Sequence, residues 1–335
     1  MKVLCIGDLH YKIDNLDQHL EIFDIIKNEL IENDEIEMIV VMGDVLHNHE
    51  RLYIESLNKV SDLLIMLASF KPTYVLIGNH DYLNNKQFLT EKHSLYTLKD
   101  KIDNLIIVDK VIKENNFIFM PYVPDGRFHE ALNTIENWTS INVIFAHQLI
   151  DGANLPIRVN NVERWDEPIV VISGHIHNSQ TVYYEDGIYN NKMNPRWFYV
   201  GACRQIAVNE NPNKKGPMIL DIPEESNLNI KKIGKVRIEL NLPLYHSITI
   251  DNFDNVPDDL DDYTHIILKM KSNDINRFKI EHADIIKSKK IIYKFINNDK
   301  PIVQKTDINI MDIFQRKIQN KNEIIELCKK YDSME

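Results

Sequence analysis

Four of the ten glycines in this 335-residue chain come directly before a side chain that can bind a metal ion. Each follows an apolar stretch typical of a β-strand, and a glycine there lets the backbone turn sharply out of the strand. The four pairs are Gly7-Asp8, Gly43-Asp44, Gly78-Asn79 and Gly174-His175. His147, after the apolar segment INVIFA, adds a fifth donor. The spacing therefore predicts that metal-binding side chains meet at one edge of one sheet.

The complete donor set mixes carboxylate, imidazole and amide groups, which suits borderline-hard divalent ions such as manganese, iron or zinc. Its members are Asp8, His10, Asp44, Asn79, His147, His175 and His177. Seven ligands are too many for one tetrahedral zinc ion and fit two ions, which the Asp44 carboxylate could bridge at a separation of about 3.5–4 Å. Such a pair polarises a phosphate and promotes in-line attack by a water or hydroxide.

Each of these pieces has a simpler explanation when it is taken alone. A GD dipeptide is usually a turn, and a buried histidine is more often a hydrogen-bonded core residue than a ligand. Within Asp8-Leu9-His10 and His175-Ile176-His177, however, the two donors are two residues apart, so they point the same way on extended backbone. The combination, always after an apolar strand, favours a metal site.

The first 175 residues alternate strand-like and helix-like segments, which predicts a layered α/β domain with its chemistry at the carboxyl ends of parallel strands. Apolar residues at helical spacing predict helices over Leu16–Ile31 and Leu52–Leu67. The predicted strands cover Val3–Ile6, Met38–Met42, Thr73–Ile77, Leu105–Val108, Phe117–Met120, Val143–Phe145 and Ile169–Ile172.

The pattern changes after residue 180. The segments TVYY, WFYVG, PMILDI and KVRIEL predict strands of a second sheet that completes the core. An acidic segment over 251–262 marks a boundary or an exposed turn. Beyond it the sequence predicts strands over 265–270 and 290–295, a helix over 274–286 and a final amphipathic helix over 311–331. We therefore expect a catalytic domain over 1–240 and a small α/β cap over 241–335.

Composition limits the location and the partners of the protein. Three widely spaced cysteines indicate a reducing compartment and neither a disulfide framework nor a thiolate metal site. The sequence shows no secretory signal and no apolar run of about 18 residues, so we expect an intracellular protein, cytoplasmic or nuclear, with no membrane partner. The net charge of −11 argues weakly against a surface that grips nucleic acid everywhere.

The motifs GDLH, GDVLH, GNHD, AHQ and GHIH resemble, in order, the five motifs of the calcineurin-like metallophosphoesterase superfamily. The resemblance implies two β-sheets sandwiched by helices. It implies that Asp8, His10, Asp44 and His177 hold one ion and that Asp44, Asn79, His147 and His175 hold the other. It also implies that His80 contacts the scissile phosphate and protonates the leaving oxygen, and that Asp81 orients His80. A plain turn or helix cap is the alternative for Asp81.

The residues that flank these motifs separate branches of the superfamily. Protein Ser/Thr phosphatases carry an arginine and a glycine soon after the second aspartate, whereas Asp44 here is followed by Val-Leu-His. GDVLH is similar to the GDLFH of the double-strand-break-repair nuclease subunit, the SbcD-type exonuclease family. That likeness implies that His47 sits beside the metals and positions substrate. The alternative is a histidine that only hydrogen-bonds within its loop.

The same likeness implies DNA as substrate, a role in DNA repair, a capping domain, a homodimer formed through N-terminal helices such as 52–67, and an SMC-like ATPase partner. Two features depart from it: Tyr11-Lys12 follows His10 where the family has Leu-Gly, and the catalytic half has no clear basic stripe. Candidate phosphate contacts are Arg127, Arg158, Arg164, Arg204, Lys287, Lys289 and Lys290, the last near Tyr293 and Phe295.

The sequence therefore predicts a DNA nuclease that uses two divalent ions, with manganese favoured and iron or zinc as alternatives. The main rival is a phosphomonoesterase or a cyclic-nucleotide phosphodiesterase built on the same metal core. A binding module that has kept the fold without activity is a third reading. The intact donor set together with His80 argues against it.

Overall fold

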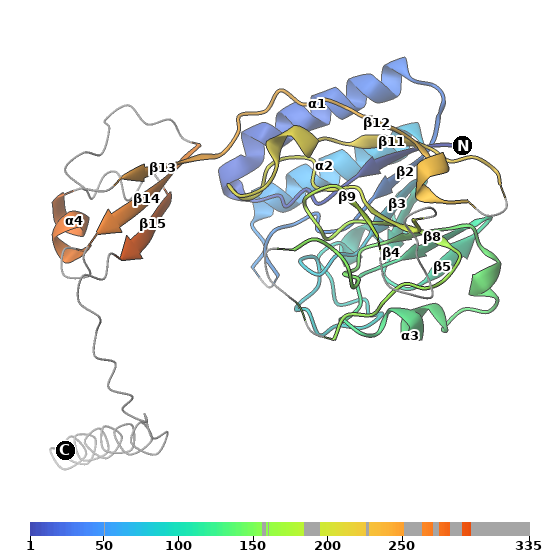
Figure 1. Cartoon of the computed structure of the whole chain (residues 1–335). Helices are drawn as coiled ribbons and strands as arrows, with labels where there is room; N and C mark the ends of the chain where they lie inside the picture. The colour runs from blue at the N-terminus through green and yellow to red at the C-terminus, as the bar shows by residue number, and fades with distance from the viewer. Residues whose placement is uncertain are drawn as a thin grey trace, which may run out of the picture. The chain divides into compact units, whose positions relative to one another are not determined.

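The computed structural model describes residues 1–49, 51–155, 159, 161–183, 195–225, 228–250, 263–270, 275–281 and 290–295. The chain forms two compact units, residues 1–246 and 247–335. Figure 1 shows the larger unit as two stacked sheets with helices on their outer faces.

The first sheet has the strand order β12-β11-β1-β2-β3-β4. Strands β1 to β4 are parallel to one another. Strand β11 pairs antiparallel with β1, and β12 pairs antiparallel with β11. The strands are β1 (Lys2–Ile6), β2 (Ile36–Val41), β3 (Thr73–Leu76), β4 (Leu105–Val108), β11 (Met218–Asp221) and β12 (Gly234–Arg237).

The second sheet has the order β5-β6-β7-β8-β10-β9. Strands β6, β7, β8 and β10 are parallel, and β5 and β9 close the two edges in antiparallel fashion. The strands are β5 (Ile112–Glu114), β6 (Phe117–Met120), β7 (Val143–Ala146), β8 (Val170–Ser173), β9 (Gln180–Val182) and β10 (Trp197–Tyr199).

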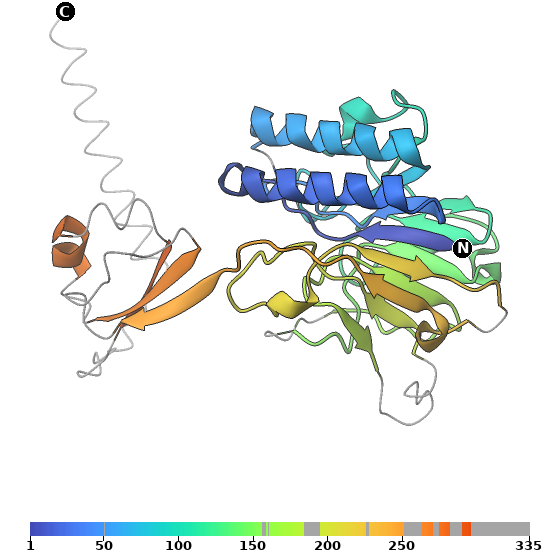
Figure 2. The ribbon, with the colours of Figure 1, turned by 90° about the horizontal axis from the view of Figure 1, so that it is seen from above.

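Alternating side chains along the strands build three apolar layers. In β1, Val3 and Cys5 pack between the two sheets, whereas Leu4 and Ile6 pack against the helices. Those helices, α1 (Leu16–Glu32) and α2 (Ile54–Phe70), lie side by side over the first sheet, as Figure 2 shows. The short helix α3 (Phe128–Leu132) covers the outer face of the second sheet.

This arrangement confirms the predicted fold class, two β-sheets sandwiched by helices. It corrects two finer expectations. The predicted donor segments follow strands of both sheets, not of one. The strands after residue 180 do not form a sheet of their own: β9 and β10 extend the second sheet, and β11 and β12 extend the first. Periodicity identifies a strand but carries no information on its partner, which explains both errors.

The smaller unit contains a sheet in the order β13-β14-β15, in which β14 (Thr264–Met270) and β15 (Lys290–Phe295) are parallel. Strand β13 (His246–Ile250) begins at the boundary between the units, and α4 (Ile275–Glu281) follows β14. The two predicted strands are found, and α4 covers residues 275–281 of the helix predicted over 274–286, the rest of which lies outside the described residues. The acidic segment 251–262 and the predicted helix over 311–331 lie outside the described residues.

Short 3-10 turns connect several of these elements: Ile13–Asn15, Tyr96–Leu98, Trp138–Ser140, Pro212–Lys214 and Ile230–Lys232. Within the described ranges, no helix combines the length and the apolar character needed to cross a bilayer.

On α2, Leu63 and Leu64 are buried in the core of their own unit, whereas the Ile65 side chain is 46% exposed. Most of the apolar surface of this helix is thus explained by packing within the subunit.

The start of α3 makes the stability of this unit depend on pH. Glu163 accepts hydrogen bonds from the backbone amides of Phe128 and His129, and its Oε1 lies 3.0 Å from His129 Nδ1. The hydrogen bond to Glu163 raises the pKa of His129 above its ordinary value. A raised histidine pKa contributes stability that is complete below the unfolded pKa, about 6.5, and that is lost as pH rises through the folded pKa.

We therefore expect His129→Gln to reduce the free energy of unfolding most between about pH 5 and 6, where Glu163 is ionised and His129 is protonated. The deficit should shrink as the pH is raised above 7. Urea unfolding of both proteins at pH 5.5, 7.0 and 8.5 measures it. A deficit that is constant or grows with pH would contradict this account.

Candidate metal centre

Two groups of donors, all buried except the half-buried His175 and His177, lie at the rim where the two sheets meet. In each group the ligand atoms lie within 4.8 Å of one another. One group is Asp8, His10 and His177, and the other is Asp44, His147 and His175. These residues follow β1, β2, β7 and β8, and Asn79 follows β3. The structure thus brings together all seven side chains that the sequence predicted as ligands.

The first group has the geometry of an ion site. The Nε2 atoms of His10 and His177 are 3.1 Å apart, and His10 Nε2 is 3.5 Å from Asp44 Oδ2. Asp8 is fully buried, and the described part of the chain offers its Oδ2 atom no hydrogen-bond partner. A buried carboxylate oxygen without a donor is costly unless a cation satisfies it. The donor set therefore fits a divalent ion at this position.

The second group surrounds the other oxygen of Asp44. Asp44 Oδ1 is 3.3 Å from His147 Nε2, which in turn is 3.2 Å from Asn79 Oδ1. His175 Nδ1 lies 2.8 Å from the same Asn79 oxygen. The two oxygens of Asp44 thus contact histidines of both groups, as expected for a carboxylate shared by two ions. Together with the family match reported below, these groups indicate a dinuclear metal site.

The charges of the site agree with cation binding. Burial disfavours a charged His147, but the Asp44 carboxylate outweighs burial and raises the pKa of His147 to about 9. Burial lowers the pKa of His175 to about 3, so this imidazole is neutral, whereas His147 would release its proton on binding an ion. The buried carboxylates therefore draw positive charge into the site, which is the electrostatic condition that a divalent ion requires.

Two of the candidate ligand histidines are oriented by partners that the sequence analysis missed. His147 Nδ1 is 2.6 Å from the carbonyl oxygen of Met42, and His177 Nδ1 is 2.7 Å from Glu210 Oε1. The other oxygen of Glu210 is 2.7 Å from Lys215 Nζ. Such contacts fix the tautomer and leave Nε2 available to a metal. Glu210 lies in the loop after β10, and no motif or spacing marks it, because only the pairing of β10 with β8 brings it near His177.

The backbone at the centre is held in an unusual conformation. Four of the donors have positive φ angles: 28° at Asp8, 49° at His10, 49° at Asp44 and 78° at His175. Non-glycine residues rarely adopt this left-handed region, and they cluster at functional sites where surrounding structure enforces it. The donors themselves therefore make the sharp turns that the sequence analysis assigned to the preceding glycines.

The glycines are needed for a different reason, the close approach of neighbouring segments. A Cβ at Gly7 would collide with the carbonyl of Gly201, and one at Gly174 with the carbonyl of Met42. At Gly78 it would collide with the amide and the carboxylate of Asp44. Among these four glycines, only Gly43, with φ 95°, combines a close contact with a positive φ angle. The close approaches at Gly78 and Gly174 thus join two segments that carry candidate ligands, whereas Gly7 approaches the segment that follows β10.

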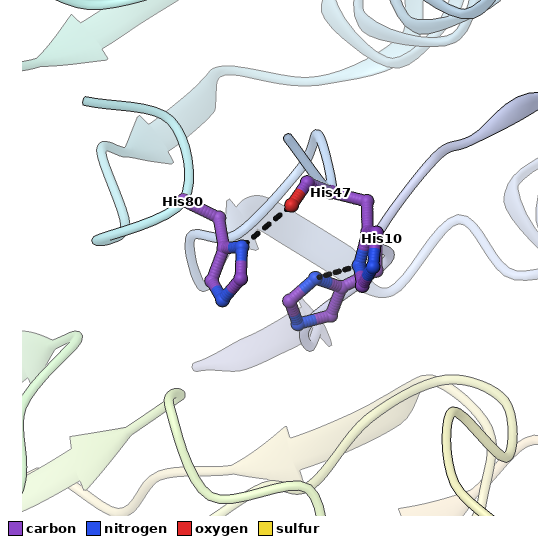
Figure 3. Close-up of side chains that lie close together, drawn as sticks. All are labelled: His10, His47 and His80. Carbon is purple, nitrogen blue, oxygen red and sulfur yellow. Dashed lines mark hydrogen bonds between the residues drawn. The ribbon is translucent and has the colours of Figure 1, made fainter. Parts of the chain in front are cut away.

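A third group of ring nitrogens, from His10, His47 and His80, lies beside the two ligand groups. His47 Nδ1 is 3.2 Å from His10 Nδ1, and His80 Nδ1 is 2.6 Å from the carbonyl oxygen of His47 (Figure 3). The His80 amide also donates to Asp44 Oδ1 at 2.9 Å. The histidine of GDVLH therefore lies at the centre, and its backbone orients His80.

The Asp81 carboxylate contacts backbone amides, and its role in orienting His80 stays a prediction. The carbonyl of His47 holds the His80 ring, and both Asp81 oxygens accept backbone amides, those of Gly78 and Leu46 at 3.0 Å and that of Val45 at 3.2 Å. Burial and the neighbouring Asp44 carboxylate raise the pKa of Asp81 to about 6. The alternative reading, a residue that fixes a turn, describes Asp81 better.

The predicted phosphate contacts are mostly engaged elsewhere. Arg204 is 2% exposed, and its Nη1 atom lies 3.2 Å from Gln18 Oε1, so it belongs to the interior. Arg127 pairs with Glu130, and Arg164 with Asp166. Lys290, Tyr293 and Phe295 lie in β15 of the smaller unit. Three further candidates lie outside the described residues: Arg158, Lys287 and Lys289.

Comparison with known proteins gives one family match and several relatives. The model of the family described as Calcineurin-like phosphoesterase matches residues 1–195. The "Putative phosphoesterase 244L" of Invertebrate iridescent virus 6 is 35% identical over 307 residues, which cover 87% of this chain and 99% of that protein. The "Putative phosphoesterase 078R" of Invertebrate iridescent virus 3 is 39% identical over 199 residues, which cover 56% of each chain.

Among solved structures, a purple acid phosphatase from yellow lupin (Lupinus luteus) seeds aligns with a TM-score of 0.43 and 15% sequence identity. The alignment covers 66% of this chain and 49% of the lupin chain.

The close approach of Gly78 to Asp44 gives a first test of the centre. Gly78→Ala places a methyl group on the Asp44 carboxylate, so we expect it to weaken Mn²⁺ binding at least about tenfold in calorimetric titration. The matched control is Gly234→Ala in β12, where a Cβ would first meet the Asp221 side chain at 3.1 Å. Equal affinities in the two variants would show that the close approach at Gly78 is not required.

The contact between Glu210 and His177 gives a second test. Removal of a carboxylate that orients a ligand histidine typically lowers metal affinity by about 10- to 100-fold, and we expect that loss for Glu210→Gln in the same titration. Glu225→Gln is the control, because Glu225 is half-exposed and pairs only with Lys232 among the described residues. Unchanged affinity in Glu210→Gln would remove Glu210 from the centre.

Proposed function

The chain belongs to the calcineurin-like phosphoesterase family, and on that premise we propose that it is a DNA nuclease that hydrolyses phosphodiester bonds. One observation carries the proposal: His47, the histidine of GDVLH, lies with its Nδ1 atom 3.2 Å from Nδ1 of His10. GDVLH is the motif that resembles the SbcD-type repair nucleases. Its histidine is therefore in reach of a substrate phosphate held at the centre.

The proposed reaction needs the two ions at the positions described above. Divalent ions bound there would polarise the phosphate and lower the pKa of a water molecule. Asp8, His10, Asp44 and His177 would hold one ion, and Asp44, Asn79, His147 and His175 the other. The mixed oxygen and nitrogen donors favour manganese in this proposal, with iron or zinc as alternatives.

His80 is the proposed general acid. Its Nδ1–H donates to the carbonyl oxygen of His47 at 2.6 Å, which fixes the tautomer and leaves Nε2 as the atom that carries the exchangeable proton. A protonated His80 would transfer that proton from Nε2 to the leaving oxygen as the P–O bond breaks. The His80 amide is anchored on Asp44 Oδ1, so the acid is positioned by a residue that also contacts both ligand groups.

A phosphomonoesterase or a cyclic-nucleotide phosphodiesterase is the second candidate. The net charge of −11 and the paired state of Arg127 and Arg164 favour a small ester over a long polyanion. The two candidates use the same metal centre and differ in the surface around it.

The proposal extends to partners. Exposed aliphatic side chains on α1 and α2, namely Leu20, Ile31 and Ile65, suit a helical contact between two copies of the chain. The likeness to repair nucleases further suggests an SMC-like ATPase as partner and DNA repair as the process.

Parallel assays separate the two candidates. We expect the purified protein with Mn²⁺ to hydrolyse linear duplex DNA, with kcat/KM at least about tenfold above the values for cyclic nucleotides and p-nitrophenyl phosphate, because a nuclease uses binding energy from the polymer. If only the monoester were turned over, the nuclease proposal would fail.

His80→Ala controls for contaminating activity and tests the acid. Loss of a general acid typically lowers kcat by about 10²- to 10⁴-fold, and His246→Ala, an exposed histidine of β13, should have no such effect. DNA cleavage that is as fast in His80→Ala as in the wild type would belong to another protein or exclude this role.

A further inference from the structure

A pocket of about 540 Å³ opens beside the histidines of the metal centre, a size within the range of ligand sites. It is lined by Asn48, His49, Arg51, Tyr53, Leu83 and Asn84. Two chain segments form it. One begins directly after His47, and the other begins three residues after His80. The residues that line the pocket therefore follow closely, in sequence, the two histidines that we place next to the scissile phosphate.

His49 joins the pocket to the centre. Its ring stacks on the His80 ring, with centroids 4.8 Å apart and an interplanar angle of 15°. His49 Nδ1 lies 3.1 Å from the carbonyl oxygen of Tyr82, so it also fixes the first segment to the second. A group bound in the pocket would consequently be one ring away from the proposed general acid.

The lining combines apolar faces with hydrogen-bond donors. Tyr53 is 49% exposed and Leu83 is 43% exposed, so each presents a flat or aliphatic surface to the pocket. Asn84 Oδ1 already accepts the Lys86 amide at 3.0 Å, which leaves its NH₂ group as a donor. Arg51 is exposed and has no carboxylate within ion-pair distance among the residues that the structure describes.

This is the chemistry that recognises a nucleobase. Aromatic rings stack on bases of any sequence, side-chain amides bond to base edges, and an arginine stacks on a base or binds the adjoining phosphate. A base can offer its face to Tyr53 only after it leaves the helical stack, as in single-stranded nucleic acid or at a frayed end.

We propose that this pocket binds the unstacked nucleobase next to the phosphate at the metal centre, with Tyr53 as its stacking surface. The inference rests on the proposed nuclease function and deepens it, because it assigns the enzyme to single-stranded or frayed nucleic acid. A small ester without a base would not use this pocket.

Calorimetric titration of the Mn²⁺-loaded protein tests the proposal with two ligands, deoxyadenosine monophosphate and deoxyribose phosphate. Both present a phosphate to the metals and only one carries a base, so the ratio of their Kd values reports the base alone. We expect the nucleotide to bind at least about fivefold more tightly in the wild type, because one stacked base supplies that much. The ratio should fall to about one in Tyr53→Ala and persist in Tyr53→Phe.

Tyr96→Ala is the matched control, because Tyr96 is 52% exposed and lies outside the pocket, and it should keep the wild-type ratio. Binding of deoxyribose phosphate by each variant shows that its centre is folded. If Tyr53→Ala does not fold, Leu83→Ala replaces it, with a lowered ratio expected. A ratio near one in the wild type, or a wild-type ratio in both alanine variants of the pocket, would overturn the proposal.

These outcomes are independent of DNA cleavage. Base preference without cleavage of DNA would refute the nuclease and keep the pocket, whereas DNA cleavage without base preference would refute the pocket alone.

Discussion

The Asp44 carboxylate is the contact on which the centre depends, because each of its oxygens faces a different group of ligands. Oδ2 lies near His10, and Oδ1 lies near His147 and accepts the His80 amide. This position is reached only because Asp44 itself is left-handed and because Gly78 allows its own backbone to pass against the Asp44 amide. A single side chain thus links the two candidate ligand groups to the backbone of His80.

Hydrogen bonds from the next residues hold that arrangement in place. Asp81 accepts the amides of Val45 and Leu46 and that of Gly78, which ties the loop after β2 to the turn after β3. Across the rim, the Cys203 amide donates to the Gly7 carbonyl and the Ala202 amide donates to the His177 carbonyl. Strained donors need such support, because left-handed φ angles are not stable in a free loop. The loops at the centre are therefore joined to one another by hydrogen bonds that involve backbone atoms.

The sequence predicted those parts of the protein that have a local signature. The alternation in β1 and the helical spacing in α1 have their cause in neighbouring residues, and each glycine–donor pair is read directly along the chain. Features that depend on partners distant in sequence were missed. Cys5 pairs with Met218 in the first sheet, and Glu210 meets His177 only through β10. For Asp81 the sequence left two roles open, because backbone amides as partners leave no trace in side-chain patterns.

The contact of His147 Nδ1 with the Met42 carbonyl oxygen joins the two sheets at the rim. His147 follows a strand of the second sheet, whereas Met42 and Asp44 follow a strand of the first. An ion bound by both Asp44 and His147 would therefore link the first sheet to the second. Any ligand that binds only the native state adds its binding energy to stability, so occupancy of the centre would resist shear between the sheets. The rim that carries the metal centre would then also hold the two sheets together.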